Sequence, residues 1–441
     1  MLMFWVQFVL VLAAVLIGIR RGGVSLGLIG GLGVSLLVLG FRSAPSEPPI
    51  AVMLIILAVV TASATLQVAG GLDYLVQLTE RLLRAHPKYV TILAPLSTFF
   101  LTVCVGTGHA VYALLPVIAD VAVKTGIRPE RPMAISSVAS QMGITASPVA
   151  AAVTFFLGFA AKAGYPVTLI DIIMITLPAG VAGLLVAAAW SFNRGKDLDQ
   201  DMEYQQRLQD PDFRKALDAE VTTLGQQIPF TAKLSVALFF AGVGTIIFLA
   251  SFPQLLPLVG GKPVAMTTVV QFVMLAFGAF IMFLADVKAK DIAHSSVFTA
   301  GMIAVVSIFG IAWMSDTFIS ANKAYLVDSI GAMVKMAPWT FAIATFCISA
   351  FVKSQAATLA ITLPLGLALG LPVPLLLGLM PASYAYFFFA FYPSDLAAIN
   401  FDRTGTTRIG KYLLNHSFMI PGLIGVSVAT LVGYLISRMM F

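Results

Sequence analysis

The feature that most constrains this chain is its succession of apolar stretches about as long as a membrane is thick. A helix needs roughly 20 apolar residues to cross the hydrocarbon core of a bilayer. We predict spanning helices at residues 3–19, 24–40, 50–70, 133–158, 170–190, 232–252, 264–284, 296–314, 374–399 and 417–437. The sequence therefore predicts an all-α polytopic membrane protein, because helices satisfy their own backbone hydrogen bonds in lipid.

The composition excludes a soluble globular protein. Of 441 residues, 59% are hydrophobic and only 10% are charged, with a mean hydropathy of +0.97, whereas soluble domains carry about 25% charged residues. The first stretch lacks a basic leader and a cleavage site and ends at Arg20 and Arg21, so we expect a retained span. Cys104 and Cys347 lie in apolar runs, which predicts neither a disulfide nor a metal site.

The positive charge is explained by membrane topology. The net charge is +6 with a pI near 9.3, and most lysines and arginines fall on one face when the loops are assigned alternately to two sides. Cytoplasmic loops carry such an excess. We therefore expect the polar connector at residues 191–231 in the cytoplasm and both termini on the periplasmic side. The connector's charges are expected only to solvate it, and no nucleic-acid partner is implied.

Two more apolar segments, residues 89–121 and 339–370, have polar centres and are interpreted as re-entrant hairpins. They contain matching strings, GTGHAVYALLP from Gly106 and SQAATLAITLP from Ser354. Proline pairs keep nearly the same separation, namely Pro87 with Pro338, Pro129 with Pro374, and Pro148 with Pro393. We infer two membrane repeats, residues 1–190 and 232–441, each with about five crossings and one hairpin. An odd number of crossings makes the second repeat inverted, as in many secondary transporters.

Polar and helix-breaking residues mark a hairpin tip and a broken crossing in each half. Non-helical backbone is tolerated at membrane depth only beside protein or water, so these breaks predict one polar cavity. The candidate substrate-binding residues are Gly106, Thr107, Gly108 and His109, then Ser140, Gln141, Thr145, Ser147 and Pro148, then Ser354, Gln355 and Thr358, and finally Tyr392, Pro393 and Ser394. Half-helix N-termini and hydroxyl groups suit an anion.

Five ionisable residues are candidates for a charge or proton path, namely Lys353, Asp395, Glu80, Arg84 and Arg128. Lys353 and Asp395 lie within membrane segments, where charged side chains are costly and usually functional, but a purely structural pair is the alternative. Glu80, Arg84 and Arg128 fit equally well as charges at the membrane–water interface. His109, taken alone, also fits a satisfied interior histidine.

The chain is not predicted to be an enzyme. It lacks HExxH, GxSxG and GxxxxGK[ST], so neither hydrolysis nor ATP-driven transport is supported, and no cofactor or metal is expected. A gated anion channel stays open as an alternative because re-entrant half-helices also build pores. Broken crossings in inverted halves favour a carrier.

Four strings resemble a known family. They are RRGGVSLGLIGGLG from Arg20, GTGHAVYALLPVI from Gly106, ITASPVAAAV from Ile144 and YPSDLAAINFDRTGTTRIGKYLLNHSFMIPG from Tyr392. Together they resemble the bacterial anaerobic four-carbon dicarboxylate (Dcu) carriers, over essentially the whole chain. The resemblance implies exchange of fumarate, malate or aspartate for succinate across the inner membrane of a bacterium that respires fumarate. Kinship with the wider ion-transporter superfamily implies an elevator-type movement of the hairpin-bearing part.

Residues and resemblance together predict a secondary transporter of four-carbon dicarboxylates that works as a fumarate/succinate antiporter. The alternatives are the gated anion channel and a carrier for another organic anion such as citrate. The expected partners are small dicarboxylates and the lipid bilayer. Coupling to protons or sodium and assembly into a homo-oligomer stay open.

Overall fold

The structure is a computed structural model, which describes residues 2–21, 23–218, 222–326, 328, 336–390, 392–411 and 414–441. The first part of the chain forms α1 (Leu2–Arg21), α2 (Ser25–Ser35), α3 (Ile50–Val68), α4 (Gly71–Ala85), α5 (Val90–Val105), α6 (Val111–Lys124), α7 (Glu130–Met142), α8 (Ala151–Lys162) and α9 (Leu169–Phe192). The connector contains α10 (Met202–Arg207) and α11 (Pro211–Asp218).

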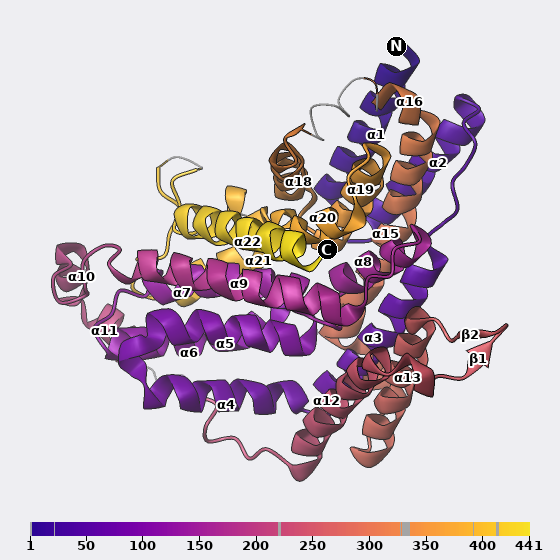
Figure 1. The fold of residues 1–441 in the computed structure, drawn as a ribbon. Helices are drawn as coiled ribbons and strands as arrows, with labels where there is room; N and C mark the ends of the chain where they lie inside the picture. Colours follow the sequence, from indigo (N-terminus) through magenta and orange to yellow (C-terminus); the bar gives the residue numbers. More distant parts are fainter. Residues whose placement is uncertain are drawn as a thin grey trace.

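The second part of the chain is also almost wholly helical. It forms α12 (Phe230–Ser251), α13 (Met266–Leu284), α14 (Ala289–His294), α15 (Ser296–Ala321), α16 (Lys323–Leu326), α18 (Trp339–Val352), α19 (Gln355–Ala368), α20 (Val373–Gly378), α21 (Pro393–Phe401) and α22 (Met419–Met440). The strands β1 (Leu258–Val259) and β2 (Lys262–Pro263) pair antiparallel in one surface hairpin (Figure 1).

Within the described residues, eight helical segments are long and apolar enough to cross a membrane. They are Ile50–Val68, Pro87–Val105, Glu130–Lys162, Leu169–Phe192, Phe230–Ser251, Met266–Leu284, Ser296–Ala321 and Met419–Met440. Shorter apolar helices cover Leu2–Gly18 and Ser25–Gly40. The prediction of an all-helical polytopic membrane protein is therefore confirmed. The segment at 374–399, predicted as a broken crossing, is divided between α20 and α21.

The helices form two groups that lie side by side (Figure 1). In one group, α9 runs along α22, while α5 packs on α7 and α9 and α6 packs on α4 and α7. In the other group, which we call the scaffold, α15 packs on α2 and α3, α1 on α2, and α13 on α3 and α12. Helix α19 packs on α15 of the scaffold and on α8.

Two glycines let the scaffold helices α2 and α15 approach closely. A Cβ atom on Gly27 would lie 2.0 Å from the carbonyl oxygen of Val306, and one on Gly310 would lie 1.8 Å from that of Gly27. Neither position accepts a side chain without moving backbone. Close backbone contact of this kind is how small residues stabilise helix pairs in lipid.

Both predicted hairpins form as helix pairs, α5 with α6 and α18 with α19. Helices α6, α18 and α19 each have 14 residues, which at about 1.5 Å per residue gives about 21 Å. That length falls short of the ~30 Å hydrocarbon core. Three of the four hairpin arms are thus too short to span it.

The two hairpin tips have the same backbone conformation. The first helix of each pair ends in a left-handed residue, Gly106 with φ 82° and Lys353 with φ 53°. An extended residue follows and caps the next turn, Thr107 with φ −140° and Ser354 with φ −152°. By backbone conformation Gly106 corresponds to Lys353. The matching sequence strings instead align Gly106 with Ser354, one residue later.

The two broken crossings are interrupted over different lengths. The first breaks after Met142, where a 3-10 turn at Gly143–Ala146 precedes the extended Ser147, and resumes at α8. In the second, 3-10 turns at Met380–Ser383 and Tyr386–Phe389 separate α20 from α21. The break was predicted at residues 392–395, but Pro393 begins α21, where proline's missing N–H removes no helical hydrogen bond.

Candidate functional site

A cavity of about 150 Å³ lies where both hairpin tips meet the scaffold. The tips contribute Gly106, Thr107, His109, Lys353, Ser354 and Gln355, the broken crossings contribute Ile144, Val149, Tyr386 and Tyr392, and the scaffold contributes Val60, Ser63, Val297 and Gly301. A single water needs only about 10–15 Å³ of such volume. The cavity therefore has room for a small solute.

The first tip presents a histidine in a defined orientation. The backbone N–H of His109 donates to the Thr107 hydroxyl over 3.3 Å, and that hydroxyl lies 2.9 Å from His109 Nδ1. The Thr107 hydroxyl thus holds the imidazole in position through Nδ1, and either atom of this pair can be the donor.

The second tip is joined to the first broken crossing through two glutamines. Gln355 Nε2 donates to the backbone carbonyl of Gln141 over 2.7 Å. The side chain of Gln141 in turn lies against Gly108, where an added Cβ would approach its amide nitrogen to 2.3 Å. Within the described residues, the Oε1 atoms of Gln141 and Gln355 are buried without a hydrogen-bond partner.

Several predicted hydroxyl donors already donate to backbone carbonyls of the protein. Ser140 donates to Ser137 O over 2.7 Å, Thr145 to Met142 O over 3.1 Å, Ser147 to Val103 O over 2.8 Å and Thr358 to Ser354 O over 2.8 Å. These four residues do not line the cavity, and neither do Gly108, Gln141, Pro148, Pro393 and Ser394. Of the predicted substrate-binding residues, the structure gathers Gly106, Thr107, His109, Ser354, Gln355 and Tyr392 around it.

Asp395 lies behind the cavity wall and is 1% exposed. Ser137 donates to its Oδ1 over 2.6 Å, and the Ser394 hydroxyl lies 2.9 Å from that of Ser137. Oδ2 has no hydrogen-bond partner in the described part of the chain. Lys353, which lines the cavity, attracts Asp395 electrostatically.

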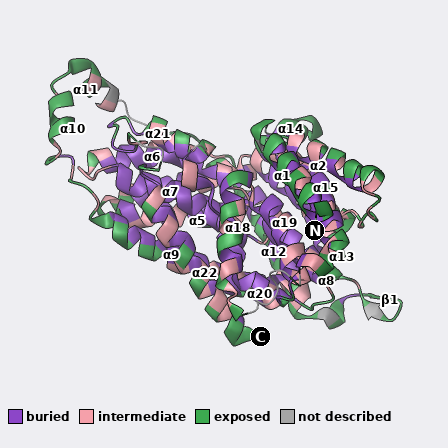
Figure 2. Ribbon diagram, turned by 90° about the horizontal axis from the view of Figure 1, so that it is seen from above, coloured by how far each residue is buried: buried purple, intermediate pink, exposed green. Residues whose placement is uncertain are grey.

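Helix α7 explains how this polar cluster is positioned. All of its residues from Glu130 to Met142 are buried, although many of them are polar. Figure 2 shows α7 in the buried interior between α5 and α6. Ser137 was not among the predicted residues, although it lies one helical turn before Ser140 on this helix and was therefore detectable by its spacing. Tyr386 was not predicted either, because it lies in an aromatic run.

Glu80 and Arg84 lie away from the cavity. Arg84 Nε contacts Glu80 over 2.7 Å and its NH2 contacts Asp120 over 3.0 Å. Glu80 also accepts hydrogen bonds from Thr222 and Thr223 of the connector, over 2.7 and 2.5 Å. Burial raises the pKa of Glu80, but these hydrogen bonds and Arg84 outweigh it and hold the pKa below its ordinary value. The pair thus fastens the connector to α4.

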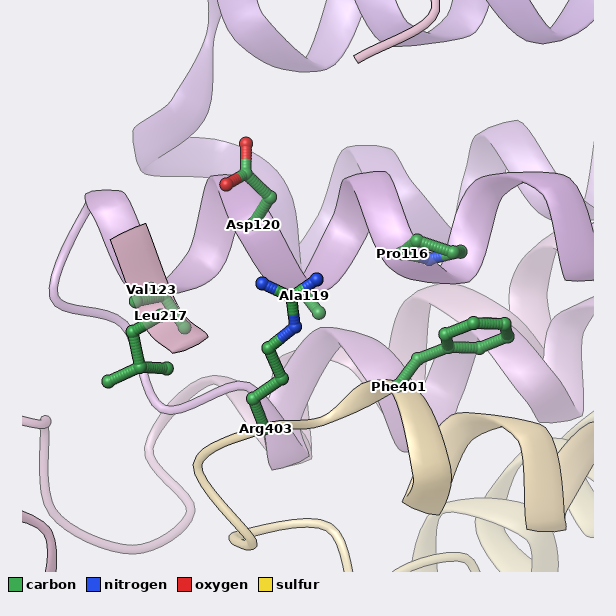
Figure 3. A pocket seen from close by; sticks show the side chains of 7 residues that line it. All are labelled: Pro116, Ala119, Asp120, Val123, Leu217, Phe401 and Arg403. Atoms are coloured by element: carbon green, nitrogen blue, oxygen red, sulfur yellow. The ribbon is translucent and has the colours of Figure 1, made fainter. Parts of the chain in front are cut away.

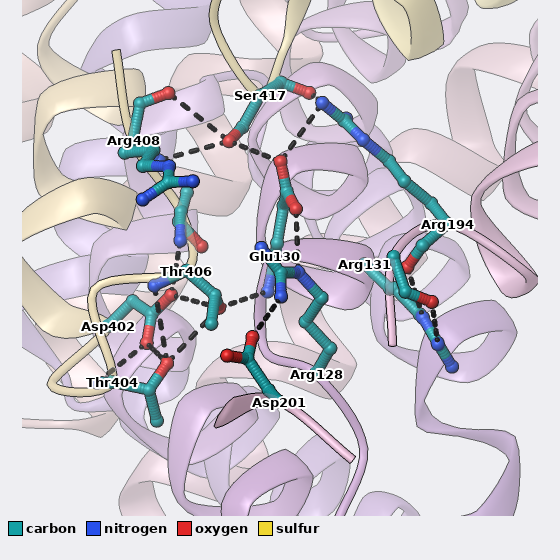
Figure 4. A network of polar contacts seen from close by, with 12 residues as sticks. Arg128, Glu130, Arg131, Arg194, Asp201, Asp402, Thr404, Thr406, Arg408 and Ser417 are labelled. Carbon is teal, nitrogen blue, oxygen red and sulfur yellow. Dashed lines mark hydrogen bonds and ion pairs between the residues drawn. The ribbon is translucent and has the colours of Figure 1, made fainter. Parts of the chain in front are cut away.

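Arg128 belongs to an ion-pair network at the N-terminus of α7 (Figure 4). Its Nε lies 2.9 Å from Glu130 and its NH1 lies 2.5 Å from Asp201 of the connector. Glu130 also accepts from Arg194 over 2.9 Å and from Ser417 over 2.7 Å. The network joins α7, the connector and the segment before α22.

The prediction that the connector's charges only solvate it is wrong. Asp197 lies 2.8 Å from Arg131, Asp201 pairs with Arg128, and Glu203 lies 3.5 Å from Arg408. Arg207 also donates to Thr404 O over 2.7 Å. These partners are distant in sequence, so the charge pattern alone could not indicate them.

A second small pocket, of about 30 Å³, lies between α6, α11 and α21. It is lined by Pro116, Ala119, Asp120, Val123, Leu217, Phe401 and Arg403 (Figure 3). Its volume holds little more than one or two waters. It is too small for an organic substrate.

A polytopic helical protein whose hairpin tips and broken crossings enclose a small cavity has the architecture of a membrane transporter. Comparison with known proteins defines the kind of transporter. Residues 3–441 match the family described as anaerobic C4-dicarboxylate membrane transporters. The chain belongs to this family, which is a transporter family and not one of enzymes.

Relatives match over the full length. The chain is 44% identical over 442 residues to the anaerobic C4-dicarboxylate transporter DcuB of Escherichia coli, covering 99% of each protein. It is 37% identical over 440 residues to the C4-dicarboxylate transporter DcuA of Escherichia coli, with 99% of each covered. The C4-dicarboxylate transporter DcuA of Wolinella succinogenes is 36% identical over 436 residues, with 98% of each covered.

Two solved structures share the fold. MtrF of Neisseria gonorrhoeae, described among antimetabolite efflux pumps, superposes with a TM-score of 0.54 at 14% identity, over 91% of this chain and 84% of that one. The YdaH transporter of Alcanivorax borkumensis gives a TM-score of 0.52 at 14% identity, over 92% and 88%. At this identity the likeness concerns the fold alone.

Proposed function

We propose that this C4-dicarboxylate transporter exchanges fumarate, malate or aspartate for succinate by an elevator-type alternating-access mechanism. The observation that carries the proposal is the cavity at the two tips, whose wall is divided between hairpins and scaffold. Movement of the hairpin-bearing helices against α3 and α15 would carry the cavity's contents across the membrane. The full-length similarity to DcuB and DcuA supports the substrate class.

The cavity offers the groups that a dicarboxylate requires. The imidazole of His109 comes from one tip, and Ser354 and the ammonium of Lys353 come from the other. The helices α6 and α19 begin close to these tips, so their positive ends favour anions. Donors on two separate tips match a substrate with a carboxylate at each end.

The repeat is part of the same proposal. Residues 1–190 and 232–441 form two inverted repeats joined by the connector at 191–231, each with about five crossings and one re-entrant hairpin. Three short hairpin arms and two tips of matching conformation support this. The excess of lysine and arginine on the connector's side supports a cytoplasmic connector and periplasmic termini in a bacterial inner membrane.

Counterflow in proteoliposomes tests the function directly. Unlabelled succinate inside the vesicles should accelerate the uptake of labelled fumarate, because a carrier returns faster when it is loaded. A gated channel gives no such acceleration. A panel with citrate and amino acids separates the dicarboxylate carrier from a carrier of other organic anions.

A labelling experiment tests the topology. A cysteine introduced at Gln209 should react with an impermeant reagent only from the cytoplasm, and one added after Phe441 only from outside. Reaction of both from the same side would contradict the inverted repeat.

A further inference from the structure

We propose that Asp395 is the proton-binding group of the carrier and takes up a proton when a dicarboxylate occupies the cavity. The proposal rests on the dicarboxylate function above and deepens it by naming the coupling ion and its site. The proton passes from water on the open side to Asp395 Oδ2, and leaves with the substrate on the other side.

Among the residues that the structure describes, Asp395 is incompletely hydrogen-bonded. Another buried carboxylate of the chain, that of Asp402, has donors on both oxygens. Asp402 accepts from Thr404, from the Thr406 hydroxyl over 2.8 Å and from the Thr407 amide over 2.6 Å. Asp395 is equally buried, yet the structure records a single donor, Ser137, and its Oδ2 has no hydrogen-bond partner within the described residues. An unpartnered oxygen on a buried carboxylate disfavours the ionised form.

Asp395 shares a cation with the substrate. Lys353 attracts Asp395 and also lines the cavity. A substrate carboxylate that draws the Lys353 ammonium toward itself weakens the pairing with Asp395. A buried carboxylate that loses its cation becomes strongly unfavourable unless it is neutralised, and a proton is the group that neutralises it.

Lys353 occupies an unusual backbone position. This residue adopts a left-handed conformation with φ 53°, whereas the matching position of the first tip is a glycine. Such a conformation is unfavourable for a residue with a Cβ atom. A lysine there indicates that its side chain is needed at the tip.

The other titratable groups around Asp395 are neutral phenols. Tyr112 of α6, and Tyr384 and Tyr392 of the second broken crossing, lie near enough to interact with Asp395 electrostatically. Ser137 contacts it from α7. Among the described residues, Lys353, between α18 and α19, is the cation whose charge acts on Asp395. Protonation of Asp395 therefore responds chiefly to whether Lys353 is shared with a substrate.

The experiment uses the full-length protein in proteoliposomes with a pH dye inside. In vesicles that contain no dicarboxylate, net entry of external succinate through the wild type should acidify the interior, and an inward proton gradient should drive succinate accumulation. In Asp395→Asn, counterflow should stay within about threefold of wild type, while acidification and gradient-driven accumulation fall at least tenfold. Asp395→Glu should restore both. Asp199→Asn, which alters an exposed carboxylate of the connector, is the matched control and should behave as wild type.

A second variant keeps the proposal testable if Asp395→Asn is inactive. Ser137→Ala removes the donor to the ionised carboxylate, so the pH midpoint of succinate affinity should rise. An unchanged midpoint overturns the proposal, as does wild-type acidification in Asp395→Asn. Wild-type counterflow without acidification overturns the proton role alone. Absence of wild-type counterflow overturns the dicarboxylate exchange itself.

Discussion

Gln355 at the second hairpin tip donates a 2.7 Å hydrogen bond to the backbone carbonyl of Gln141, where the first broken crossing begins to unwind. The two residues are 214 positions apart. The bond satisfies a buried carbonyl at a helix end, where such groups lack intrahelical partners. It also makes the shape of the cavity depend on both halves of the chain at once.

Replacing Gln355 with alanine should weaken succinate binding about tenfold and lower the melting temperature. A buried carbonyl left unpaired costs about 1–3 kcal/mol, and the second tip loses its anchor on the first crossing. Thermal unfolding with and without succinate measures both effects. If succinate raised the melting temperature of the variant as much as that of wild type, the contact would not shape the site.

The hydroxyl and imidazole donors should divide into two classes. Ser354→Ala and His109→Ala should each raise KM about tenfold, because a hydrogen bond to a charged group is worth about 1.5–3 kcal/mol. Ser140→Ala and Thr358→Ala are the controls, since both hydroxyls donate to their own helix, and should leave KM within about twofold. Equal effects in both classes would place the substrate elsewhere.

Glu80 should contribute a pH-dependent part of the stability. Its pKa in the folded protein lies below the ordinary value of 4.5, so its contribution is present at neutral pH and is lost as the pH falls through the folded value. Glu80→Gln should therefore lower the melting temperature at pH 7 and differ less from wild type at acid pH. A difference independent of pH would argue against an ionised Glu80 in the folded state.

An ion pair links the end of α8 to the scaffold. Lys162 Nζ lies 3.3 Å from Asp316 Oδ2 beside a cavity of about 780 Å³ between α3, α8, α15 and α19. Because the pair is partly exposed, it is worth about 0.2–1 kcal/mol. In vesicles of defined orientation, the KM for succinate can be measured from each side of the membrane. Lys162→Ala should change the ratio of these two KM values by no more than about fivefold. The double reversal K162D/D316K should restore the ratio.

The sequence predicted the hairpins and breaks well because their causes are local. Glycines and prolines in long apolar segments interrupt helices wherever they occur, so Gly106 and the polar residues around Ser354 indicated both tips. The second break was misplaced because Pro393 can either interrupt a helix or begin one, and only the neighbouring backbone decides.

The cavity-facing side chains were harder to predict because tertiary contacts select them. Nothing in the sequence distinguishes the hydroxyl of Ser354, which lines the cavity, from that of Thr358, which donates to its own helix. The bond from Ser137 to Asp395 spans 258 positions. The connector's ion pairs likewise depend on distant partners.

In the two-tip site, one carboxylate of the substrate lies at each hairpin tip. Competition for labelled succinate during counterflow tests this site most directly. Butyrate has the same chain length as succinate but would leave the donors of one tip unpaired, at about 1–3 kcal/mol for each buried donor. We predict that fumarate competes at concentrations tens- to hundreds-fold lower than butyrate does. Equal competition by butyrate and fumarate would contradict the two-tip site.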